Sequence, residues 1–81
     1  MPKGEKVLRF ALAANPRMST KKCSTLFGVS APTVTRWREI LEGELRAVRG
    51  LPREGQIEYF EFWWGATPTG AAKILDTWLG E

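Results

Sequence analysis

The sequence contains no histidine and only one cysteine, Cys23. Without histidine, the chain lacks the side chain that most often serves as a physiological acid or base and as a metal ligand. A single thiol can form neither an internal disulfide nor a zinc site, so we expect Cys23 to be a buried structural residue. No glycine-rich segment has the spacing of a nucleotide-binding loop. These absences predict a non-enzyme with no cofactor, no metal and no small-molecule ligand.

Long apolar runs are also missing, and none approaches the roughly 20 residues that a membrane-spanning helix needs. The opening residues MPKGEK do not resemble a signal peptide. We therefore expect a cytoplasmic protein with no membrane partner. A chain of 81 residues has room for one small core, which predicts a single domain over residues 1–81.

The charge is distributed unevenly along the chain. Residues 1–53 contain eleven Lys and Arg against four acidic residues, which gives +7. Residues 54–81 contain one Lys against five acidic residues, which gives −4. A basic half of this kind is typical of a protein that binds a polyanion, with the acidic half facing away from it.

The basic half contains a stretch that predicts two helices joined by a tight turn. The first helix covers Thr20–Phe27 and ends at Gly28, where the backbone needs a positive φ. Ser30 is expected to cap the second helix, Ala31–Glu42, by accepting from its free N–H groups. Pro32 falls in the first turn of that helix, where a missing N–H costs little.

This stretch resembles the helix-turn-helix family of DNA-binding proteins. The resemblance covers about a quarter of the chain and depends on six residues, namely Ser24, Gly28, Val29, Ser30, Val34 and Trp37. It implies that Ala31–Glu42 is a recognition helix in the major groove of double-stranded DNA. The residues placed to read base edges are then Ser30, Ala31, Thr33, Thr35 and Arg36. The residues placed to contact the DNA backbone are Lys21, Lys22, Arg38, Arg49 and Arg53.

One such module reads too little sequence to find a site in a genome. The resemblance therefore implies a homodimer on a two-fold-related site, with half-sites about one helical turn apart. The small size fits a transcriptional regulator, such as a repressor, of the kind common in bacteriophages and plasmids, located at the nucleoid. Two other functions remain open. The chain could be an architectural DNA-binding protein, such as a recombination directionality factor or a small packaging subunit, or a protein-interaction module or inhibitor that uses the aromatic residues 59–64.

The segment from residue 44 to residue 64 allows two interpretations. Its many aromatic and β-branched residues favour a hairpin of Leu45–Arg49 against Gln56–Trp63, with a loop at Gly50–Gly55. That hairpin would be the wing of a winged helix-turn-helix, so the predicted fold is mostly α with a small β-hairpin. In the all-α alternative, the recognition helix continues through Gly43 and a further helix covers Arg53–Trp64.

Both ends of the chain predict helices. Glu5–Ala14 shows an apolar stripe, and a helix beginning at Thr67-Pro68 and ending at Gly80 shows a second one. The stripe of this last helix either closes the core of the monomer or pairs with a symmetry mate. The aromatic residues in the second half are assigned to core or dimer contacts, namely Phe60, Phe62, Trp63, Trp64 and Trp78.

Overall fold

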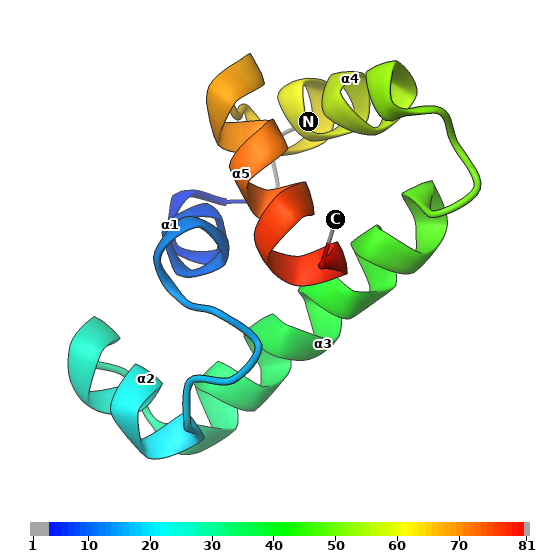
Figure 1. Cartoon of the computed structure of the whole chain (residues 1–81). Helices are drawn as coiled ribbons and strands as arrows, with labels where there is room; N and C mark the ends of the chain where they lie inside the picture. Colours follow the sequence, from blue (N-terminus) through cyan, green and yellow to red (C-terminus); the bar gives the residue numbers. More distant parts are fainter. Residues whose placement is uncertain (1–3, 81) are drawn as a thin grey trace.

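The computed structural model describes residues 4–80, which form five α-helices and, within that range, no β-strand (Figure 1). The helices are α1 (Glu5–Ala13), α2 (Thr20–Phe27), α3 (Ala31–Val48), α4 (Arg53–Trp64) and α5 (Pro68–Leu79). The long α3 runs diagonally through the molecule, with α2 near its start and α4 near its end (Figure 1). Between these two, α1 and α5 pack on α3 and on each other. None of these five helices is long and apolar enough to cross a membrane.

The first two helices agree closely with the sequence prediction. α1 buries Val7, Phe10 and Ala11 along one stripe, and the chain turns extended at Ala14. In α2, the hydroxyl of Ser19 accepts a hydrogen bond from the backbone N–H of Lys22 at 3.1 Å. This N-terminal cap fixes where α2 begins.

The prediction that the second helix ends at Gly43 was wrong. α3 continues to Val48 and buries Leu41, Leu45 and Val48, whose spacing of four and three residues is helical. Gly43 lies on the exposed side, where an added Cβ would contact nothing within 4 Å. The segment Leu45–Arg49 therefore belongs to the end of a helix and is not a strand.

The other predicted strand, Gln56–Trp63, is also helical, so the wing is absent from the described residues. α4 buries Gln56, Phe60 and Trp64 at intervals of four residues. Strand preference depends on a neighbouring strand to pack against, and α3 provides none. The all-α alternative is therefore the correct one.

The last helix is confirmed, together with its two ends. The hydroxyl of Thr67 accepts from the backbone N–H of Gly70 at 3.0 Å, and Gly80 ends the helix at φ 74°. Its stripe of Ala71, Ile74 and Leu75 is buried within this one chain. α5 therefore closes the core of the monomer.

The core consists of two clusters that share α3. The smaller cluster contains Phe10, Ala14, Cys23 and Val34 and lies where α1, α2 and the start of α3 meet. The larger cluster joins α1, the second half of α3, α4 and α5. Trp37 and Trp78 are partly buried against both clusters and connect them.

Polar contacts hold α4 to its two neighbours. Tyr59 donates a hydrogen bond from its hydroxyl to the carboxylate of Glu44 on α3. That bond, burial and the negative charge of Glu44 together raise the pKa of Tyr59 to about 12. Gln56 donates from Nε2 to the carbonyl oxygen of Val48 at 3.1 Å, which satisfies a carbonyl near the end of α3.

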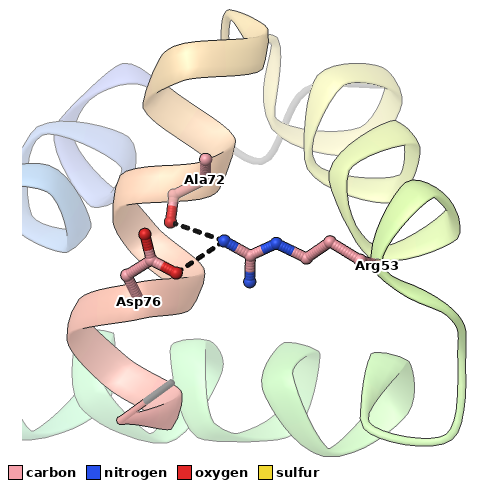
Figure 2. A network of polar contacts seen from close by, with 3 residues as sticks. All are labelled: Arg53, Ala72 and Asp76. Atoms are coloured by element: carbon pink, nitrogen blue, oxygen red, sulfur yellow. Dashed lines mark hydrogen bonds and ion pairs between the residues drawn. The ribbon is translucent and has the colours of Figure 1, made fainter.

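Figure 2 shows the polar contact between α4 and α5. Arg53 donates from one guanidinium nitrogen to Asp76 Oδ1 at 2.5 Å and to the carbonyl oxygen of Ala72 at 3.4 Å. Because Arg53 begins α4 and Asp76 lies in the second half of α5, the contact ties the two helices together. Both side chains are about half exposed, so their pairing orients the helices and contributes little stability.

Candidate nucleic-acid interface

The turn between α2 and α3 is held by a backbone hydrogen bond and by a hydrogen bond from the Ser24 side chain. Gly28 adopts the left-handed conformation at φ 65° and ends α2. The N–H of Val29 then donates to the carbonyl oxygen of Ser24 at 3.1 Å, while the hydroxyl of Ser24 donates to the carbonyl oxygen of Val29. Ser24 therefore connects the last turn of α2 to the residue before the cap of α3, and this fixes the orientation of the two helices.

Ser30 occupies the N-cap position of α3, but its side chain does not cap the helix as predicted. Its backbone has the extended conformation of a cap, at φ −72° and ψ 157°, without a bond from Ser30 Oγ to a helix N–H. The hydroxyl pairs instead with that of Thr33 at 2.9 Å. The first turn of α3 thus has no side-chain cap, and such helix ends attract anions.

The outward side of α3 begins with small and polar residues. Ala31, Thr35 and Arg36 are exposed, and Thr33 is partly exposed. Thr35 donates its hydroxyl hydrogen to the carbonyl oxygen of Ala31 at 3.2 Å, which leaves the lone pairs of its oxygen available. Arg36 makes no hydrogen bond or ion pair with any other residue in 4–80. Its guanidinium is therefore available to an external acceptor.

Arg38, which the resemblance implied as a backbone contact, is engaged inside the molecule. Its guanidinium donates to the carbonyl oxygens of Pro16, at 3.3 Å, and of Met18. It also lies 3.4 Å from Cys23 Sγ and 5.9 Å from the ring centre of Phe10. Arg38 therefore holds the loop between α1 and α2 against α3.

The remaining basic residues divide into two groups. Lys21 and Lys22 are exposed in the first turn of α2, at the end of that helix opposite the turn into α3. Arg49 follows the end of α3, about 20 Å along the helix from Arg36 at 1.5 Å per residue. Arg53 is paired with Asp76 on α5. Since the wing does not exist, neither Arg49 nor Arg53 lies in a wing loop.

Acidic residues limit the basic surface along α3. Glu39 and Glu42 are exposed, one and two helical turns beyond Arg36. Carboxylates repel the phosphates of nucleic acid, so only the first two turns of α3 can approach DNA closely. The candidate interface therefore consists of the start of α3, the start of α2 and the turn between them.

The five aromatic residues assigned to core or dimer contacts have different environments. Phe60 and Trp64 are fully buried in the larger cluster. Trp78 donates from Nε1 to the carbonyl oxygen of Ala11 at 2.8 Å. Phe62 and Trp63 are exposed on the outer side of α4, with 66% and 38% of their surface accessible.

Sequence reasoning did not identify a second feature, a cleft of about 330 Å³ beside the candidate interface. It is lined by Lys6, Arg9, Leu26, Phe27, Gly28, Val29 and Trp37. The available signal was Leu26, an apolar residue that does not fit the buried side of its helix and that is 59% exposed.

Comparisons with protein-family models, with curated proteins and with solved structures find no match to this chain.

Proposed function

We propose that this protein binds double-stranded DNA sequence-specifically, as a helix-turn-helix protein without a wing. In this proposal, the first two turns of α3 enter the major groove, and Lys21 and Lys22 contact phosphates beside it. The observation that carries the proposal is Arg36, an exposed arginine with no partner among residues 4–80, on a helix whose orientation the turn at Ser24 and Val29 fixes. Arg38 is left out of the contact set because its guanidinium holds the α1–α2 loop.

The exposed residues at the start of α3 carry side chains that can contact bases or phosphates in the major groove. Arg36 can donate two parallel hydrogen bonds to the O6 and N7 acceptors of guanine. Thr33 and Thr35 can bond a base or a phosphate or contact the methyl group of thymine, and Ala31 can supply only the apolar contact. Ser30 lies at the uncapped helix end, where a phosphate is attracted. We propose that the protein is a small transcriptional regulator that acts as a repressor, with several copies bound at each DNA site.

The experiment begins with selection of a preferred site from a random duplex pool. Affinities for that site and for random DNA are then measured by fluorescence anisotropy at several salt concentrations. We expect the log–log slope against salt to be about −0.9 for each phosphate contact. An absence of binding at low salt, or failure of the selection to yield a site, would contradict the proposal.

Variants then test the proposed roles. Arg36→Ala should weaken binding to the selected site by about 1–3 kcal/mol, or roughly 5-fold to 150-fold, because one bidentate contact is lost. Its effect on random DNA should be much smaller. Arg46→Ala is the matched control, since Arg46 is also exposed on α3 but lies beyond Glu39 and Glu42. Equal losses on both DNAs for Arg36→Ala would mean that Arg36 contacts only phosphate.

A further inference from the structure

The exposed side of α4 presents a strongly exposed aromatic residue, Phe62, among acidic residues, with the less exposed Trp63 next to it. Glu54, Glu58 and Phe62 follow one another at intervals of four, so they form a row along the helix, and all three are exposed. Glu61 is exposed beside them. The ring of Phe62 lies at 88° to that of Trp63, with ring centres 5.0 Å apart, which supports it from one side. We call Glu58, Glu61 and Phe62 the α4 knob.

The cleft beside the α2–α3 turn has the complementary shape and composition. Its walls are the side chains of Leu26, Phe27 and Trp37, and its volume of about 330 Å³ is at the lower end of the range for ligand pockets. A space of that size suits one inserted side chain better than a large ligand. Leu26, which is 59% exposed, gains the most from being covered.

The charges around the cleft are also complementary to the knob. Lys6 lies at its edge, and Lys22 is one turn before Leu26 on the same side of α2. Arg9 is also at the edge, but Glu5 pairs with it at 2.6 Å. In a two-fold dimer with two α4 knobs in contact, the carboxylates of the two copies would repel one another. A knob that contacts the cleft instead places Glu58 and Glu61 near lysines.

The two surfaces belong to helices near opposite ends of α3 (Figure 1). We propose that the α4 knob of one copy inserts Phe62 into the α2–α3 cleft of the next copy. Such a contact joins two different surfaces, so a pair of copies still has one free knob and one free cleft to which further copies can add. The chain therefore associates head to tail, forming rows or rings in place of the two-fold dimer implied by the resemblance.

The test uses two variants that each disable one surface, and it needs no DNA. Phe62→Ser removes the knob, and Leu26→Glu adds a carboxylate at the cleft that repels Glu58 and Glu61. Sedimentation velocity should show that the wild-type chain grows beyond a dimer as its concentration rises, while each variant remains monomeric at 9.1 kDa. An equimolar mixture of the two variants retains one intact knob and one intact cleft. It should therefore form a dimer and stop there.

Leu51→Ser is the matched control, because Leu51 is 44% exposed and belongs to neither surface. It should associate like the wild type. Lys6→Glu is a second cleft variant that leaves the apolar lining intact and should weaken association in the same direction as Leu26→Glu. Circular dichroism would verify that each variant is folded. Any of three results would overturn the proposal. The wild type could be monomeric, Leu51→Ser could reduce association as much as Phe62→Ser does, or the mixture of the two variants could stay monomeric.

Discussion

The two ends of α3 differ in what surrounds them. At its start, α3 contributes Val34 to the smaller cluster with Phe10, Ala14 and Cys23, and its other side exposes small and polar residues together with Arg36. At its end, it contributes three of the ten buried residues of the larger cluster and is joined to the acidic α4. The two halves of this continuous helix therefore differ, because the second half contains most of its buried residues and the first half exposes residues such as Thr35 and Arg36.

The polar contacts follow the same division. At the end of α3, Tyr59 and Gln56 of α4 bond to Glu44 and Val48, so helix is joined to helix. At the start of α3, Arg38 bonds to carbonyl oxygens of a loop. A loop held by one side chain is easier to release than a helix held by a core, so the two regions should respond differently to substitution.

The largest expected effect compares two phenylalanines on α4. Phe60→Ala should lower the free energy of unfolding by about 3–5 kcal/mol, because Phe60 is fully buried in the larger cluster. Phe62→Ala, two residues along the same helix, should change the free energy of unfolding of the monomer, measured at low protein concentration, by no more than about 0.5 kcal/mol, since its ring is 66% exposed in the single chain. Urea denaturation followed by circular dichroism measures both. Similar costs would mean that the larger cluster is not the main source of stability.

A smaller effect is expected at the start of α3. Arg38→Met should destabilise the protein by about 1–3 kcal/mol, because the carbonyl oxygens of Pro16 and Met18 lose their donor. Local loosening should also speed the reaction of the buried Cys23 thiol with a thiol reagent. Arg36→Met is the control and should change neither quantity. An unchanged labelling rate for Arg38→Met would show that the loop is held by other contacts.

The smallest effect concerns the hydroxyl of Tyr59 and its dependence on pH. Tyr59→Phe should destabilise the protein by about 0.5–1.5 kcal/mol at neutral pH, because it removes the donor to Glu44. The pKa of Tyr59 is raised from 10.0 to about 12, so the folded state favours the neutral phenol. Its contribution is therefore complete below pH 10 and is lost as the pH rises from 10 towards 12. Urea denaturation across this range should show a steeper loss for the wild type than for Tyr59→Phe, and equal slopes would contradict this assignment.

Most of the first half of the fold could be predicted because its signals are local. Ser19 and Gly28 mark the two ends of α2, and both act there as the sequence indicated. Cys23 is buried as expected. Thr67 and Gly80 mark the ends of α5 in the same way. These caps and glycines act on the residues next to them, so the sequence alone revealed them, whereas the cap expected at Ser30 is not formed because its hydroxyl pairs with that of Thr33.

The second half was harder because its signals conflict. Phe60 and Trp64 are aromatic residues, which favour strands, but their spacing of four residues favours a helix. The segment is helical because α4 packs on α3 and α5. Gly43 suggested that α3 would end there, but the helix continues to Val48 because burial of Leu45 and Val48 stabilises its last turns. In both cases tertiary packing outweighed local preference.

The candidate site was predicted in part. The exposed positions of Thr35 and Arg36 follow from helical spacing. The position of Arg38 does not, because its partners lie 20 and 22 residues earlier in the chain. A long-range contact between a guanidinium and loop carbonyls leaves no pattern in the sequence. The cleft beside Leu26 likewise depends on how three helices meet.

The hydrogen bond from Trp78 to the carbonyl oxygen of Ala11 joins residues 67 positions apart. The ring of Trp78 also lies 5.9 Å from that of Phe10, in the smaller cluster that supports the start of α3. During synthesis on the ribosome, α5 is the last of the five helices to be made. The packing of Trp78 beneath the α2–α3 surface can therefore form only after α5 has been synthesised. Until then, a nascent chain lacks this contribution to the stability of that surface.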